Sequence, residues 1–162
     1  LIDWLPNNIP DDDANSIVHG DFRLDNMVLH ADKPEVLAVL DWELSTLGHP
    51  LGDFTYHLMQ WFMPSAGAST QTLEGADFDA LNIPDATEYT RLYCEHTGRD
   101  SIENMDFYIA YNMFRLAGIL QGIVGRVRDG TASNEHAALM ENRVKPLSDV
   151  GWFYAQKAGA VG

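Results

Sequence analysis

Cysteine is almost absent from this sequence of 162 residues, in which Cys94 stands alone. One cysteine cannot form an intramolecular disulfide or a thiolate cluster, so packing must stabilise the fold and any metal site must use oxygen or imidazole ligands. Long hydrophobic runs are absent too, since no stretch approaches the roughly 18 to 20 uncharged apolar residues that a membrane helix needs. The N-terminus lacks the order of a signal peptide. We therefore expect a cytoplasmic protein without a membrane partner.

Basic residues are scarce: ten lysines and arginines face 24 acidic residues, which gives a net charge of -14. Because the bases are not clustered, this charge would repel nucleic acids and anionic membranes. It would favour a cationic substrate or a divalent metal ion. A solvated acidic surface is the commoner reason for such a composition.

Apolar residues make up 46% of the chain and charged residues 21%, which suits one soluble domain with a core of its own. Short apolar runs separated by turn-forming residues occupy the first 52 residues or so, and helical periodicity dominates from there on. We expect strands at 16–18, 27–30 and 36–40, the last two joined as a hairpin. The pattern thus predicts an α+β fold whose strands come first.

The predicted helices follow the strands. Aromatic and apolar periodicity indicates helices over 54–63 and 85–96, and then a long helix that Ser101 should cap. Ser133 should begin the last helix, and Pro146 should interrupt it. The methionine and aromatic stripes of these helices are typical of core residues.

Chemistry-bearing residues concentrate in the strand-rich part. The spacing H-x-D-x-x-x-x-N occurs at His19, Asp21 and Asn26, and Asp41 follows Asn26 by fifteen residues. A random chain of this composition would contain this spacing about 0.03 times, which makes the match moderately specific. A turn-and-cap origin is the competing interpretation, because Asp and Asn are common turn residues.

The predicted hairpin gives these residues a spatial context. Antiparallel pairing around its turn makes opposite residue numbers add up to about 65, 66 or 67. An odd sum places the side chains of Asn26 and Asp41 on one face, whereas the even sum separates them. An amide oxygen and a carboxylate on one face would suit Mg²⁺.

Three segments, 19–26, 41–43 and 48–53, resemble the catalytic loop, the metal-binding aspartate and the following segment of the aminoglycoside phosphotransferase and choline kinase superfamily. These enzymes are relatives of the protein kinases. The run His-Gly-Asp-Phe-Arg-Leu-Asp-Asn most resembles a branch of phosphotransferases, some fused to acyl-CoA dehydrogenase domains and acting on hydroxyacyl-CoA esters. The resemblance implies a mainly helical C-terminal lobe of a kinase-like fold, with a small β-hairpin that carries the catalytic and metal residues.

The resemblance also implies roles for single residues. Asp21 is expected to orient the acceptor hydroxyl and take its proton, and Arg23 to stabilise the transferring phosphate. Asn26 and Asp41 are expected to bind Mg²⁺ and, through it, ATP. Structural support of the catalytic loop is expected from two further residues, His19 and Asp53.

The upstream parts of such an enzyme are not in the sequence. Only 18 residues precede His19, and they include no lysine or glycine, although kinases grip ATP phosphates with a glycine-rich loop and a lysine upstream. Since Leu1 is not methionine, we expect that something precedes it in a parent protein. We expect residues 1–162 to be the C-terminal lobe alone, without the nucleotide lobe and therefore inactive or nearly so. The uncovered lobe face should favour self-association.

Two other functions remain open. One is a metal-dependent hydrolase that uses an imidazole and carboxylate cluster. Its ligands would come from the set His19, Asp21, Asp41, His49, Asp53 and His57. The other is a degenerate lobe that serves as a non-catalytic scaffold, which the intact Asp21, Asn26 and Asp41 argue against.

The identity of the hydroxyl acceptor is also open. Six residues of the helical part either line an acceptor site or pack in the core: Trp61, Phe62, Tyr108, Tyr111, Asn112 and Arg115. The acidic charge suits an aminoglycoside or choline. The sequence of the catalytic loop instead suggests a hydroxyacyl-CoA ester, which is anionic.

Overall fold

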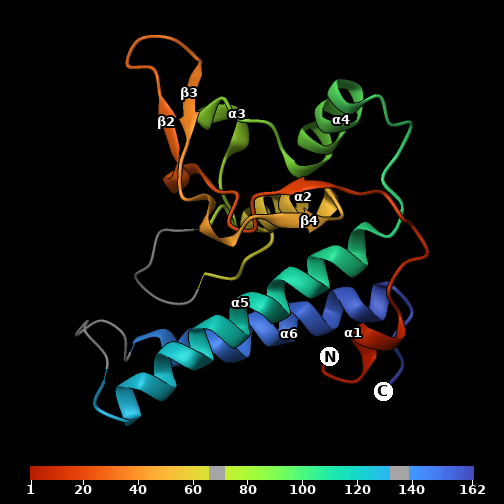
Figure 1. Ribbon diagram of the computed structural model, residues 1–162, viewed down its shortest axis with the longest axis vertical. Helices are drawn as coiled ribbons and strands as arrows, with labels where there is room; N and C mark the ends of the chain where they lie inside the picture. The colour runs from red at the N-terminus through yellow and green to blue at the C-terminus, as the bar shows by residue number, and fades with distance from the viewer. Residues whose placement is uncertain (66–71, 132–138) are drawn as a thin grey trace.

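The computed structural model describes residues 1–65, 72–131 and 139–162. Two short antiparallel sheets precede and flank a set of helices (Figure 1). The first sheet pairs β1 (Ser16–Val18) with β4 (Thr46–Gly48), and the second is the hairpin of β2 (Met27–Leu29) and β3 (Val36–Val39). The architecture is therefore α+β, with its strands in the first third of the chain.

Six helices complete the described part of the chain. They are α1 (Trp4–Asn7), α2 (Leu51–Leu58), α3 (Phe78–Leu81), α4 (Ala86–Thr97), α5 (Met105–Arg128) and α6 (Glu141–Lys157). Single 3₁₀ turns lie at Leu24–Asn26, Trp42–Leu44 and Met59–Trp61. Within the described residues, no helix is sufficiently long and apolar to span a bilayer.

The core has two parts that meet along α5. One side of α5 packs on α6, and its buried residues include Ile109, Met113 and Leu147. The other packs on α2, where Leu51 and Leu58 are buried at 2% and 0% exposure. Figure 1 shows α5 and α6 side by side, with α2 lying across α5 and the β2–β3 hairpin projecting away from these helices. The strand-rich segment is thus supported on the helices from one side.

Several expectations need correction. The long helix begins at Met105 rather than after Ser101, because Asn104 adopts a left-handed backbone (φ 56°) and its carbonyl accepts from the amide of Phe107. Pro146 lies inside α6 without interrupting it. The carbonyl that this proline cannot pair belongs to the exposed Asn142 in the first turn, where water can solvate it.

The other differences are smaller. The helix expected over 54–63 starts earlier, at Leu51, and its last part is the 3₁₀ turn Met59–Trp61. Strand β4 and the short helices α1 and α3 were not predicted. The expected start of the last helix at Ser133 falls outside the described residues. The hairpin and the helix over 85–96 are confirmed to within one residue at every end.

Candidate active site

The loop that follows β1 is held by a carboxylate from α2. Asp53 lies in the first turn of α2, and its Oδ2 accepts from the backbone nitrogen of His19 at 2.5 Å. Its Oδ1 accepts from the backbone nitrogen of Gly20 at 2.9 Å. Hydrogen bonds to a charged acceptor are among the stronger ones in proteins. Asp53 therefore fixes two successive peptide groups just before Asp21.

Gly20 lets the loop turn tightly against the 3₁₀ turn that contains Leu44. Its φ is +83°, a left-handed conformation that favours glycine. A Cβ atom at this position would lie 2.6 Å from the backbone oxygen of Leu44. Both the conformation and the space thus require a glycine here.

His19 joins the loop to the end of β3. Its side chain is only 2% exposed, and its Nε2 lies 2.7 Å from the carbonyl oxygen of Leu40. Because a carbonyl can only accept, Nε2 carries the hydrogen, and Nδ1 is then the acceptor for the Asp21 amide at 3.2 Å. The ring also packs on Trp42, with ring centres 4.7 Å apart. Both ring nitrogens form hydrogen bonds with backbone groups, so His19 fixes the loop to the end of β3.

The Asp21 side chain is oriented by Asn26. The amide nitrogen of Asn26 donates to the Asp21 carboxylate at 2.9 Å and to the Asp21 backbone oxygen at 2.8 Å. The two hydrogens of this nitrogen are thus used, which leaves Oδ1 of Asn26 as the atom that can face a metal ion. Asp21 itself is partly exposed. Its carboxylate can therefore meet a ligand while its orientation is restrained.

Tyr56 approaches Asp21 from α2, and sequence analysis gave it no role. It is 5% exposed, and burial raises the pKa of its phenol, which hydrogen bonding with Asp21 and the charge of Asp21 raise further. The phenol consequently stays protonated beside the carboxylate. Nothing in the motif spacing marks Tyr56, since it reaches the loop through the packing of α2.

Arg23 pairs with Asp25 two residues further along the loop. Burial acts to lower the pKa of Arg23, but the hydrogen bond with Asp25 and the charges of Asp25 and Asp21 outweigh it, and the pKa is raised. The guanidinium therefore remains charged. It lies in the electrostatic field of Asp21.

Asp41 occupies an exposed position directly after the hairpin. Its backbone is left-handed, with φ 66°, and it precedes the 3₁₀ turn Trp42–Leu44. The paired residue numbers near the open end of the hairpin add up to 66, as in Met27 with Val39. In a regular strand with this even sum, the side chains of Asn26 and Asp41 would point to opposite faces of the hairpin. The left-handed backbone of Asp41 also ends the regular alternation of side chains before this residue. The register argument for a shared ion therefore does not apply.

The oxygen donors nonetheless fit Mg²⁺ by their chemistry. Asp41 offers an exposed carboxylate, Asn26 offers Oδ1, and both are hard ligands of the type that Mg²⁺ prefers. Such an ion keeps several waters and phosphate oxygens in its shell, so two protein ligands suffice.

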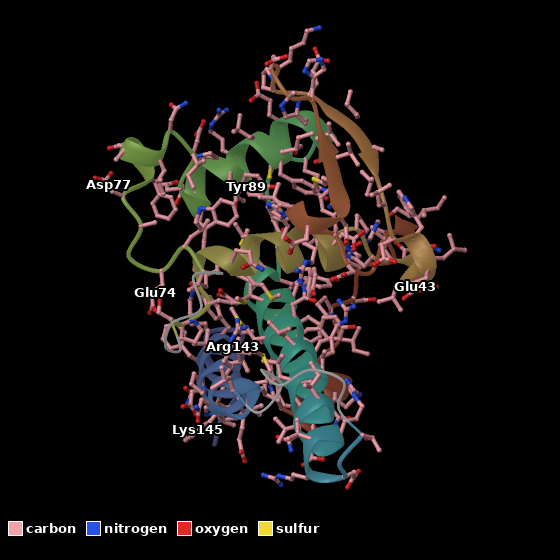
Figure 2. The ribbon with its side chains drawn as sticks, turned by 90° about the vertical axis from the view of Figure 1, so that its left-hand side faces the viewer. Glu43, Glu74, Asp77, Tyr89, Arg143 and Lys145 are labelled. Atoms are coloured by element: carbon pink, nitrogen blue, oxygen red, sulfur yellow. The ribbon has the colours of Figure 1, made fainter. Side chains whose placement is uncertain are left out.

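The cluster expected for a metal-dependent hydrolase does not assemble. Across residues 1–65, 72–131 and 139–162, no group of three or more His, Cys, Asp or Glu side chains is arranged to hold a metal ion. His49 bonds Asp12 at 2.9 Å. His57 lies among aromatic rings, 5.5 Å from the ring centre of Tyr89, which Figure 2 shows between α4 and α2. Within these ranges, the six residues of that hypothesis therefore do not form one metal site.

Most of the residues considered for the acceptor site belong to the packing of the helices. Asn112 is 1% exposed and donates to the Gly52 carbonyl and to Thr55 Oγ1. Trp61 donates to the Pro84 carbonyl at 3.0 Å.

Of the remaining acceptor candidates, two pack against other rings and one contacts the loop before Asp21. Phe62 packs on Tyr154, and Tyr108 stacks on His49. Arg115 donates to the carbonyl of Gly20 in the loop that precedes Asp21. Tyr111 alone of the six has an exposed side chain.

A pocket of about 350 Å³ lies elsewhere, between α1 and the start of α5. Its lining includes Trp4, Asn104 and the ion pair of Asp106 with Lys157, 2.9 Å apart. None of the motif residues lines it. Asp21 is partly exposed. The β2–β3 hairpin near it in the chain projects away from α5 and α6 in Figure 1.

Comparison with known proteins decides the family. The sequence pattern of the phosphotransferase enzyme family matches residues 1–92, which is more than half of the chain. The chain belongs to this family. It is also similar to a solved structure from Ralstonia eutropha that is named as an aminoglycoside phosphotransferase, with a TM-score of 0.87 and 53% identity over 96% of this chain and 47% of that one.

Curated relatives of this phosphotransferase-family chain are acyl-CoA dehydrogenase family members. Mouse member 10 is 42% identical over 159 residues, which cover 98% of this chain and 15% of the relative. Human member 11 is 40% identical over 153 residues, which cover 93% of this chain and 19% of the relative. The chain thus spans a fifth or less of these relatives and about half of the solved structure. The resemblance drawn from the three motif segments and the kinase-like phosphotransferase fold are confirmed.

Proposed function

We propose that the protein transfers the γ-phosphate of ATP to a hydroxyl group of a small molecule. The observation that carries this proposal is the Asp21 carboxylate, which Asn26 orients at 2.9 Å on a loop that Asp53 fixes by two backbone amides. Family membership supports it. A metal-dependent hydrolase has less support, because no group of three or more of its candidate ligands is arranged to hold a metal ion within the described residues.

In the proposed reaction, Asp21 orients the acceptor hydroxyl and takes its proton as the oxygen bonds to the γ-phosphorus. The bond from that phosphorus to the bridging oxygen breaks, and ADP leaves with that oxygen. Arg23, which keeps its charge, stabilises the phosphoryl group in transit. Asn26 and Asp41 would hold Mg²⁺, which neutralises charge on the phosphates when bound.

We further propose that residues 1–162 form the C-terminal lobe of a two-lobed enzyme and have little activity alone. The chain covers 47% of the solved relative. Large apolar side chains of the hairpin are exposed, namely Val28, Leu29, Val36, Leu37 and Leu40. A nucleotide-gripping lobe packed on this hairpin would cover them and supply the missing phosphate contacts.

The acceptor is proposed to be a hydroxyacyl-CoA ester, with aminoglycosides and choline as the alternatives. Curated relatives named as acyl-CoA dehydrogenase family members support the first. The net charge of -14 and the name of the solved relative support the alternatives.

The decisive experiment measures ADP release by the full-length protein with MgATP and each of the three acceptor classes. We expect turnover with at least one class, and loss of about 1,000-fold or more in kcat for Asp21→Asn, whose amide cannot accept the proton. Asp79→Asn, an exposed change on α3, is the matched control and should retain activity. Equal turnover of Asp21→Asn and wild type would contradict the assigned base, whereas no turnover with any of the three acceptor classes would favour a scaffold role.

A further inference from the structure

Arg115 lies in the middle of α5 and reaches the catalytic loop across 95 residues of sequence. Its Nη2 donates to the backbone carbonyl of Gly20. This carbonyl belongs to the peptide group that joins Gly20 to Asp21. The amide of the same peptide group donates to Nδ1 of His19 at 3.2 Å. Both polar ends of the peptide that precedes the Asp21 side chain are therefore held.

The Arg115 guanidinium also contacts Tyr56. Its Cζ lies 4.9 Å from the centre of the Tyr56 ring, within the range of a cation–π interaction. Tyr56 in turn faces the Asp21 carboxylate, which acts on its phenol. One arginine thus touches the backbone on one side of Asp21 and the ring that packs beside its carboxylate.

These contacts restrain the position of Asp21. Gly20 has the conformational freedom of a glycine at φ +83°, so its carbonyl needs an external partner to stay in one orientation. A charge-assisted hydrogen bond from a half-buried guanidinium is a strong partner of this kind. The planar guanidinium can form this bond and stack on Tyr56 at once, which a lysine cannot do.

We propose that Arg115 is a positioning residue for Asp21, acting through the Gly20 carbonyl and the Tyr56 ring. This inference rests on the proposed function in its kinetic part, because it assumes that Asp21 does the chemistry. It differs from the expectation that Arg115 lines an acceptor site. A positioning residue affects kcat, whereas an acceptor ligand affects the KM for the acceptor.

The kinetic test uses the full-length protein with MgATP and the acceptor that gives the highest turnover, or water as acceptor if none does. We expect Arg115→Met to lower kcat about 10- to 100-fold, the loss of one charge-assisted hydrogen bond, with the KM for ATP and acceptor changed less than about twofold. Arg115→Lys should recover part of kcat. Arg126→Gln, an exposed change three turns further along α5, should match wild type.

The structural test measures amide hydrogen exchange by mass spectrometry and needs no turnover. Arg115→Met should speed exchange in peptides that cover 19–26 about tenfold, while exchange in α5 and α6 stays unchanged. Tyr56→Phe keeps the ring under Arg115, so it should lower kcat severalfold and leave this exchange unaltered.

Each outcome has one meaning. Wild-type kcat in Arg115→Met, or a change confined to the KM for the acceptor, would overturn the positioning role. Unchanged exchange over 19–26 would overturn it as well. If the wild type shows no ATP turnover at all, the proposed function fails, and the exchange measurement alone decides whether Arg115 holds the loop. Faster exchange throughout α5 and α6 would show a general folding defect and contradict the specific role.

Discussion

The carboxylate of Asp53 lies 2.5 Å from the backbone nitrogen of His19, although 34 residues separate the two in sequence. A second bond, to Gly20, uses the other carboxylate oxygen. Because Asp53 is in the first turn of α2, and α2 packs on α5, the loop is attached to the helical core. The position of the loop before Asp21 therefore depends on a contact with α2.

Asp53→Asn should destabilise the protein by about 2 kcal/mol. The asparagine amide can accept from one backbone N–H only, and it turns its own hydrogens toward the other, which loses its acceptor. Urea unfolding would measure this change. Asp149→Asn, which removes an exposed ion pair with Lys145, is the control and should cost less than about 1 kcal/mol. Equal effects of the two changes would contradict the anchoring role.

Gly20→Ala should destabilise the protein by about 3 kcal/mol or more. The left-handed backbone costs about 1 to 2 kcal/mol for a residue with a Cβ, and the 2.6 Å approach to the Leu44 oxygen adds a clash. Gly98→Ala separates the two terms, since Gly98 also has a positive φ but no atom lies within 4 Å of its Cβ position. Thermal unfolding should show the larger shift for Gly20→Ala, and similar shifts would argue against the clash.

His57 should make stability depend on pH. Burial lowers the pKa of His57, so between this lowered value and the ordinary value near 6.5 the unfolded chain binds a proton that the folded protein does not. Its contribution to stability is therefore complete above pH 6.5 and declines as the pH falls below it, by at most about 1.4 kcal/mol per pH unit. The free energy of unfolding should be measured from pH 7.5 down to about pH 5.5, the range in which histidine titrates. As the pH falls, it should decline less steeply in His57→Gln than in wild type. Parallel curves would refute this prediction.

The isolated chain of 162 residues should self-associate through its hairpin. Leu29 and Leu37 are 56% and 59% exposed there, and their burial in a second molecule would remove apolar surface from water. Replacing both by serine should raise the monomer fraction in sedimentation velocity runs. Leu81→Ser on α3, where exposure is 56%, is the control and should leave association as in wild type. A wild-type chain that stays monomeric at high concentration would contradict the expectation.

The long, strongly patterned parts of the fold could be predicted from sequence, and the short parts could not. Helix α4 has Asp85 as its N-cap, with a side chain that accepts from Glu88, and Gly98 at its end, so local signals define both limits. Strand β4 has three residues and exists because it pairs with β1, a partner about 30 positions away. The start of α5 was misplaced because a left-handed Asn104 ends the preceding turn.

The site residues were recognisable by type and spacing, but their contacts were not. Asp21 and Asn26 are five residues apart, and their hydrogen bond follows from the local 3₁₀ turn. Tyr56 and Arg115 reach the loop through tertiary packing, which leaves no mark in the spacing of one sequence. The register of the hairpin depends on an irregularity between Val28 and Leu29, which the apolar pattern does not encode.

The supports of the loop come from Leu40, Asp53 and Arg115, which are 21, 34 and 95 residues away from their partners. Closing such distant contacts costs chain entropy, so they form late in folding. The helix pair of α5 and α6 can assemble from neighbouring segments, whereas the loop gains its final shape only when α2 has docked on α5. Newly synthesised chains should therefore become compact before the loop around Asp21 reaches its final conformation.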